Sequence, residues 1–188
     1  MLLLPLVLDP CTQVAPGCIN FVQPNPMRGP VVLADLAGLD PVKCLHHVTG
    51  EEYARLYTSM NEWLMIQCDR VSRETGRLTK SVRLLTLKQC DARKLLNKEY
   101  LKRDGDCSRK MEDCYPQLLG AVLILDPPRW VLTVWRGLKY LFPVRFVEKL
   151  DLISSARTKE LHHRVLQYLA LEDLPSDFGG WKAGPWAA

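Results

Sequence analysis

The chain has 188 residues, of which 47% are hydrophobic and 24% are charged, which is the composition of an ordinary globular protein. These proportions exclude a wholly disordered chain and a collagen-like repeat, and no apolar run approaches the roughly 20 residues of a membrane-spanning helix. Lys and Arg outnumber Asp and Glu by 25 to 21, and the resulting charge of +4 permits contact with an anionic membrane without indicating nucleic acid.

Seven cysteines are scattered along the sequence, and none of them forms a Cys-x-x-Cys pair. This spacing gives no indication of a zinc knuckle or a thioredoxin-type site, so we expect reduced thiols in a cytosolic protein. The apolar residues 1–8 are interrupted by Pro5 and follow no Lys or Arg, which favours a buried strand or an irregular start over a secretion signal. Prolines are frequent up to residue 30, and we expect residues 1–26 to be an irregular lead-in.

The first half of the remaining chain alternates between strand and helix patterns. Residues 30–38 form an apolar, strand-like run that stops at a glycine. Residues 49–75 have apolar side chains at helical spacing, begin with the capping-box pair Thr49 and Glu52, and end before Gly76. Residues 81–90 are predicted to form a second strand.

The same alternation continues to the C-terminal end of the sequence. We predict a helix over 92–103, with 109–115 as its continuation or partner, and an almost wholly apolar strand over 120–128. An amphipathic helix over 129–142, a strand over 145–154 and a final helix over 155–170 follow. Strands that alternate with helices predict an α/β fold with a largely parallel sheet.

Several short motifs occur in a fixed order. Tyr-Pro-x-x-Leu-Gly at 115–120 leads into the apolar strand, the segment VEKLDLISS spans 147–155, and Leu-Pro-x-x-Phe-Gly-Gly closes the series at 174–180. Upstream lie RGPVVLADLAG at 28–38 and SVRLLTLKQCD at 81–91. In this order and spacing, residues 27–182 resemble the CRAL-TRIO family of lipid-binding and lipid-transfer domains.

The resemblance implies a mostly parallel β-sheet floor with flanking helices and a C-terminal gate helix over an apolar pocket. It implies a domain at 27–182 followed by a tail at 183–188. Such a domain is a carrier and not an enzyme, holds one lipid in place of a cofactor, works as a monomer, and touches membranes peripherally from the cytoplasm. The ligands that the family implies are phospholipids such as phosphatidylinositol or phosphatidylcholine, or another lipid.

The sequence also departs from the family pattern. Gln117 and Leu118 replace the Glu-Arg pair that holds an inositol phosphate in some members. The helical bundle that usually precedes the domain is absent from this sequence, so we expect a divergent minimal member, an isolated domain or a truncated chain. These departures keep open an alternative, in which a degenerate pocket leaves a non-exchanging membrane-targeting module.

The resemblance suggests side chains for the ligand's headgroup. The lysine before the last strand is retained as Lys149, and Ser81 occupies the position of a serine that contacts phospholipid. Arg83 stands where a hydroxyl residue is common. For Lys149 the alternative is a solvent-facing lysine that pairs with Glu148 or Asp151. The expected headgroup contacts are Lys149, Ser81, Arg83 and Gln117.

Period-two alternation places Val122, Ile124 and Asp126 on one face of their strand, and Leu84 with Thr86 on one face of another. We expect these five residues to line the pocket, and the alternative for each of them is ordinary core packing.

The gate helix carries an apolar stripe beside the basic residues Arg129, Arg136 and Lys139. We expect the stripe to face the membrane, and the alternative is a helix that merely packs on the sheet. The stripe and its neighbours are Trp130, Val131, Val134, Trp135, Leu138, Leu141 and Phe142.

No pattern indicates catalysis. The adjacent pairs His46-His47 and His162-His163 are poorly placed for a shared metal, because neighbours on a helix point about 100° apart. The Gly-x-Ser-x-Gly elbow, the Gly-x-Gly-x-x-Gly loop and the Walker A pattern are all missing. We therefore predict neither an enzyme nor a metal site.

Overall fold

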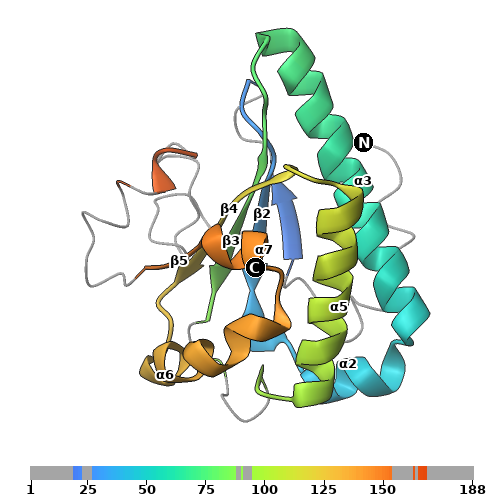
Figure 1. Cartoon of the computed structure of the whole chain (residues 1–188), viewed down its shortest axis with the longest axis vertical. Helices are drawn as coiled ribbons and strands as arrows, with labels where there is room; N and C mark the ends of the chain where they lie inside the picture. Colours follow the sequence, from blue (N-terminus) through green and yellow to red (C-terminus); the bar gives the residue numbers. More distant parts are fainter. Residues whose placement is uncertain are drawn as a thin grey trace.

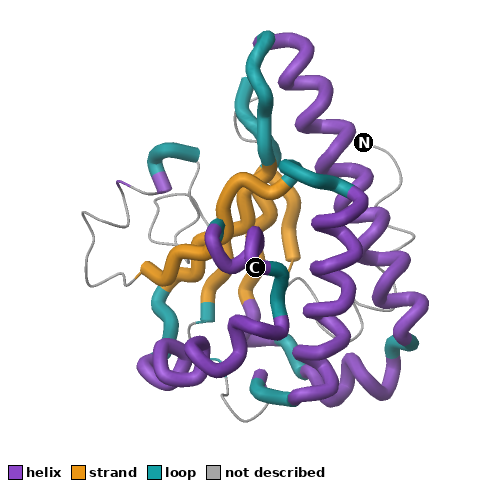
Figure 2. Tube along the Cα trace, in the orientation of Figure 1, coloured by secondary structure: helices purple, strands orange, loops and turns teal. Residues whose placement is uncertain are grey.

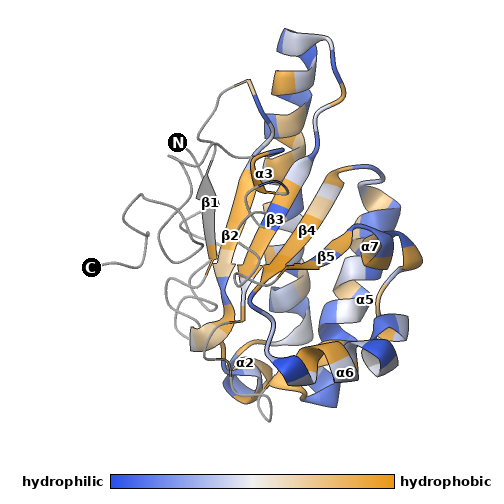
Figure 3. Ribbon diagram, turned by 90° about the vertical axis from the view of Figure 1, so that its left-hand side faces the viewer, coloured by the Kyte–Doolittle hydropathy of each residue, from blue (hydrophilic) through white to orange (hydrophobic). Residues whose placement is uncertain are grey.

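Five strands form one sheet in the computed structural model, which describes residues 19–22, 27–87, 90, 95–153, 163 and 165–168. The sheet order follows the chain order, from β1 to β5, as Figure 3 shows, and Figure 2 distinguishes the strands from the helices. Strands β2 to β5 are mutually parallel, whereas β1 is an antiparallel edge strand beside β2. The strands are β1 (Ile19–Val22), β2 (Val31–Asp35), β3 (Ser81–Thr86), β4 (Leu119–Leu125) and β5 (Leu150–Ile153).

Helical segments connect the parallel strands and gather on one face of the sheet. Because each crossover leads to the next strand in the same direction, right-handed connections place their helices on the same side. Helices α3 and α5 lie side by side there (Figures 1 and 3). The helices are η1 (Leu36–Gly38), α2 (Pro41–His47), α3 (Gly50–Thr75), α5 (Lys98–Cys114), α6 (Arg129–Leu138), η2 (Lys139–Leu141) and α7 (Val144–Glu148). The predicted α/β class is confirmed.

Helix α3 begins and ends where the sequence predicts. Thr49 accepts a hydrogen bond from the backbone N–H of Glu52 at 3.2 Å, and the Glu52 carboxylate accepts one from the backbone N–H of Thr49 at 2.8 Å. Gly76 closes the helix with φ of 67°, a left-handed conformation that a side chain disfavours. Local capping therefore fixes both ends of the longest helix.

Replacing Thr49 with alanine is expected to lower the free energy of unfolding by about 1 kcal/mol, because the N–H of Glu52 loses its acceptor. Urea unfolding measures this change. The matched control is Thr58→Ala, since the Thr58 hydroxyl only bonds back to the carbonyl of Ala54 within the same helix. Equal losses in the two variants would contradict the capping role.

The two faces of the sheet pack against different partners. On one face Leu33, Leu84 and Leu123 form a core cluster with Val165 from the C-terminal part of the chain. On the other face Val32 packs against Leu64 and Cys68 of α3. This second face, under α3 and α5, also carries the polar side chains described below.

A network of tyrosines fixes α3 against α5. Tyr53 donates a hydrogen bond to the Asp104 carboxylate at 2.8 Å, and Tyr57 donates to the same oxygen. The Tyr53 and Tyr100 hydroxyls lie 3.2 Å apart. Burial, followed by the charge of Asp104, raises the pKa values of Tyr53 and Tyr57 well above the ordinary value. The network therefore stays protonated and holds the helical layer in place.

Two sequence predictions need correction. Residues 19–22 form β1, so the lead-in is not wholly irregular; the run is too short for its alternation to be recognised. Residues 144–148 form helix α7 instead of the start of a strand, because the carbonyl of Pro143 accepts bonds from Phe146 and Val147. A third expectation is confirmed: residues 98–114 form one continuous helix, so 109–115 continues the preceding helix. The predicted helix over 155–170 and the motif at 174–180 lie largely outside the described residues.

Candidate functional site

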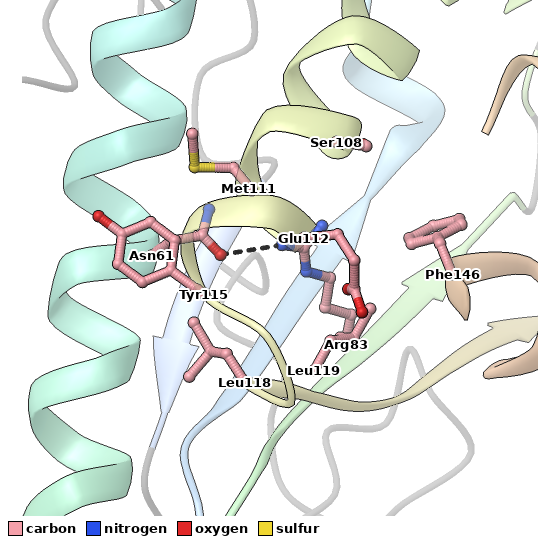
Figure 4. A pocket seen from close by; sticks show the side chains of 9 residues that line it. All are labelled: Asn61, Arg83, Ser108, Met111, Glu112, Tyr115, Leu118, Leu119 and Phe146. Carbon is pink, nitrogen blue, oxygen red and sulfur yellow. Dashed lines mark hydrogen bonds between the residues drawn. The ribbon is translucent and has the colours of Figure 1, made fainter. Parts of the chain in front are cut away.

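A small cavity of about 20 Å³ lies between the sheet and helices α3, α5 and α7 (Figure 4). A volume of this size holds roughly one water molecule. Its walls combine an apolar part with several polar side chains. The lining residues are Asn61, Arg83, Ser108, Met111, Glu112, Tyr115, Leu118, Leu119 and Phe146.

Arg83 rises from the floor of this cavity. Its Nη2 donates to Oδ1 of Asn61 on α3 at 3.4 Å, as Figure 4 shows. Its Nε is buried and has no hydrogen-bond partner within the part of the chain that the structure describes. A buried donor without an acceptor is costly, so this atom favours a further acceptor in the cavity.

Ser81 precedes Arg83 on the same face of β3, but its hydroxyl is already engaged. The side chain is 1% exposed, and its Oγ donates to the carbonyl of Leu118 at 3.0 Å. This bond ties β3 to the turn before β4. In this conformation Ser81 therefore positions the floor, and its hydroxyl does not point into the cavity as a free donor.

Lys149 lies between α7 and β5, where it forms an ion pair with Glu112 of α5. The Nζ and Oε1 atoms are 3.4 Å apart, and the two side chains are only 18% and 13% exposed. The sequence suggested Glu148 or Asp151 as partners of an exposed lysine, whereas the recorded partner lies 37 residues earlier. Lys149 thus joins α5 to the entrance of the last strand.

The register divides the expected pocket-lining residues between the two faces. Arg83 pairs with Val122, Leu84 with Leu123, and Leu85 with Ile124. Val122 and Ile124 therefore share the face of Arg83, while Leu84 and Thr86 belong to the opposite, core face. Asp126 follows the end of β4 with φ of 48°. The five residues therefore do not share one face of the sheet, and none of them is among the residues that line the cavity around Arg83.

A further segment, comprising α6, η2 and α7 (residues 129–148), we call the gate segment. Its aromatic side chains pack together: the ring centroids of Trp135 and Phe142 are 5.9 Å apart, and those of Phe142 and Phe146 are 5.5 Å apart. Val131 is only 9% exposed. Much of the predicted membrane-facing stripe is therefore turned inward here, and Trp130, Val134 and Leu141 are partly buried as well. The side chain of Leu138 lies outside the described residues.

The outward surface of the gate segment carries other apolar residues that the sequence analysis did not select. Leu132, Tyr140 and Val144 are 50%, 75% and 73% exposed. They were missed because each lies off the most continuous apolar stripe. The exposed basic residues around them are Arg129, Arg136, Lys139 and Arg145.

One face of α5 holds the gate segment against the body. A Cβ atom on Gly105 would overlap the carbonyl oxygen of Leu141, so only glycine allows this close approach. One turn later, Nη1 of Arg109 donates to the same carbonyl oxygen at 2.7 Å. Glu112 then reaches Lys149. Gly105, Arg109 and Glu112 follow one another at helical spacing, so they lie on one face of α5 and together attach residues 141–149 to this helix.

Comparison with known proteins identifies the family. The model of the CRAL/TRIO domain matches residues 17–180. The chain belongs to the CRAL/TRIO family. The matched residues include the edge strand β1.

A solved structure shares the fold of this CRAL/TRIO domain. The structure described as "Crystal structure of Sfh5" matches with a TM-score of 0.65 at 17% sequence identity. The match covers 92% of this chain and 55% of that chain, so this chain spans about half of the length of that protein. No curated protein matches the sequence. Family membership supports lipid binding in general terms.

Gln117 lies at the turn between α5 and β4 of the CRAL/TRIO domain, outside the cavity lining. It adopts φ of 72°, and its side-chain oxygen accepts a hydrogen bond from Nζ of Lys80 at 2.7 Å. Gln117 is exposed, so this geometry gives it no contact with a ligand in the cavity.

The described helices include none that is both long and apolar enough to cross a bilayer.

Tyr115 closes one wall of the cavity and donates its hydroxyl to the Glu62 carboxylate on α3. This bond raises the pKa of Tyr115 to about 12, since the neighbouring carboxylate opposes formation of the phenolate. The pKa is higher in the folded state. The stabilising contribution is therefore complete below about pH 10 and is lost as the pH rises through about 12.

Glu62→Gln is expected to lower the pKa of Tyr115 toward its ordinary value. The measurement is the ultraviolet absorbance of phenolate during alkaline titration, with the curve of Tyr115→Phe subtracted. Glu51→Gln, another acidic position on α3, is the control and is expected to leave the pKa unchanged. An unchanged curve for Glu62→Gln would refute the assigned bond.

Proposed function

We propose that this domain holds one hydrophobic ligand between the sheet and helices α3, α5 and α7, and exchanges it when the gate segment moves away at a membrane. One observation carries the proposal. The segment whose Phe146 lines the cavity also presents exposed apolar and basic side chains on its outer surface. A single element therefore joins the interior of the domain to a surface suited to membranes.

The outer surface supports membrane contact through two effects. Exposed Leu132 and Val144 gain free energy by leaving water for the lipid phase, and Tyr140 suits the interfacial region. Each basic residue near an anionic surface adds about 1 kcal/mol. Because each effect is modest, binding through this surface is reversible, as exchange requires.

Ligand entry requires the gate segment to move. The cavity of about 20 Å³ is far below the roughly 300–1,000 Å³ of ordinary ligand sites. Phe146 is the residue of α7 that lines the cavity, and α7 is only five residues long. Displacement of α7 with its aromatic neighbours would open the space above Arg83, Leu118 and Leu119.

The small cavity is also the observation that favours the second candidate function. If the gate segment stays closed, the domain binds membranes through its outer surface and holds no ligand. It is then a targeting module and not a carrier. The two functions differ in whether lipid accompanies the protein after it leaves the membrane.

The test incubates the protein with vesicles of phosphatidylcholine and phosphatidylserine, recovers the protein, and quantifies bound lipid by mass spectrometry. The double variant Leu132→Asp with Val144→Asp is expected to lose most vesicle binding and lipid uptake. Ile66→Asp, at a 60% exposed position on α3, is the matched control and retains both. Vesicle binding without bound lipid would establish the targeting module, and the absence of both would refute both functions.

A further inference from the structure

Arg83 indicates which class of lipid the site takes, an inference that rests on the proposed function. We infer that the ligand is a single-chain lipid with a terminal carboxylate, and that the guanidinium of Arg83 binds this carboxylate inside the cavity. The argument uses the hydrogen bonds of Arg83, the charges around the cavity and its size.

The hydrogen bonding of Arg83 is incomplete. Among the described residues its guanidinium bonds to the neutral amide of Asn61, at a long 3.4 Å, and to no carboxylate. Its Nε is buried without a partner. The planar edge formed by Nε and one terminal nitrogen matches the two oxygens of a carboxylate, and such paired bonds are among the strongest in proteins.

The charges around the cavity leave Arg83 unbalanced. Glu112 also lines the cavity, but its carboxylate pairs with Lys149 at 3.4 Å, and both side chains are largely buried. Ser108 and Asn61 contribute neutral polar groups to the walls. Arg83, Lys149 and Glu112 together carry a net charge of +1, so a single anionic group beside Arg83 balances the set.

The size of the cavity favours a compact polar end. About 20 Å³ beside Arg83 accommodates an atom or two of a ligand's polar end, and a choline or inositol headgroup is several times larger. Met111, Leu118 and Leu119 form one apolar part of the wall, and Phe146 of α7 lines another side of the cavity. An alkyl chain that replaces the Phe146 ring would extend from Arg83 toward the gate segment.

The experiment compares two ligands with the same chain, oleate and oleyl alcohol. The protein is exposed to vesicles that contain equal amounts of both, then recovered, and the bound lipids are quantified by mass spectrometry. We expect the native protein to retain about tenfold or more oleate than oleyl alcohol, because a hydrogen bond between two charged groups is stronger than one to a neutral hydroxyl.

Two variants are expected to change this preference in opposite directions. Arg83→Met keeps the length of the side chain and should abolish the preference while the alcohol still binds. Glu112→Gln removes the competing negative charge, frees Lys149, and should increase the preference. Arg73→Gln, an 80% exposed arginine on α3, is the control and should leave the ratio unchanged. If Arg83→Met fails to fold, the rise with Glu112→Gln still tests the inference.

The possible outcomes separate this inference from the proposed function. Equal retention of oleate and oleyl alcohol would overturn the role of Arg83 while lipid binding stands. Stronger retention of oleoyl lysophosphatidate than of oleate, in a third arm, would replace the carboxylate with a phosphate and overturn the inference. If no lipid is retained at all, the proposed function fails, and this inference fails with it.

Discussion

Gly105→Ala is expected to lower the free energy of unfolding by about 1–3 kcal/mol, the usual cost of overpacking a close contact. The added Cβ would overlap the carbonyl oxygen of Leu141, a backbone atom that cannot rotate away. The overlap separates η2 from α5 and disturbs the bond from Arg109 to the same oxygen. Urea unfolding measures the stability, and lipid exchange between vesicles is expected to become faster because the closed gate segment is weakened.

Gly137→Ala is the matched control in the gate segment itself. Gly137 lies within α6 and has no atom near the position of an added Cβ among the described residues. Alanine favours a helix over glycine by about 0.5–1 kcal/mol, so this variant should become more stable. A stability change of the same sign in the two variants would contradict the attachment of the gate segment through Gly105.

Reversing two charges on the gate segment, with Arg136→Glu and Lys139→Glu, should weaken binding to anionic vesicles by at least about thirtyfold. Removal of two basic groups costs about 2 kcal/mol near such a surface, and the new carboxylates add repulsion. Both positions are exposed, so the fold should be unaffected. Cosedimentation with vesicles that contain phosphatidylserine measures the effect, which should shrink as salt is added.

The control makes the same change in net charge at the other end of the molecule. Arg73 lies in the last turn of α3, and Arg77 directly follows its cap Gly76. This end of α3 is opposite to α6 in Figures 1 and 3. Arg73→Glu with Arg77→Glu should reduce vesicle binding only slightly. An equal loss in both double variants would mean that net charge, and not the gate segment, governs membrane binding.

Local rules in the sequence predict most of the secondary structure. The capping pair Thr49 and Glu52 and the left-handed Gly76 mark the ends of α3, because these signals act within a few residues. The almost wholly apolar run of β4 is typical of a strand that is covered on both faces, and the alternation of strands with helices predicts a parallel sheet. Helix α7 was mistaken for a strand, since a short apolar run suits either structure.

The site was harder to predict because it depends on register and on contacts between distant segments. The alternation within β3 and β4 was correct, but only the pairing of Leu84 with Leu123 shows which faces coincide. The partner of Lys149 is Glu112, and no local pattern connects these two positions. Four residues that line the cavity from α5 and its C-terminal end have helical spacing: Ser108, Met111, Glu112 and Tyr115. This spacing shows in the sequence that they share one helix face, but it does not show which part of the protein that face covers.

The central claim is that the domain encloses one lipid, and the most direct test is the lipid content of the protein as purified. The protein is isolated from a lipid-rich host without detergent, denatured, and its extracted lipids are identified and counted by mass spectrometry. Our account predicts one lipid class close to one molecule per chain, with a reduced amount in Arg83→Met. Protein that is free of lipid, and stays so after incubation with vesicles, would contradict it.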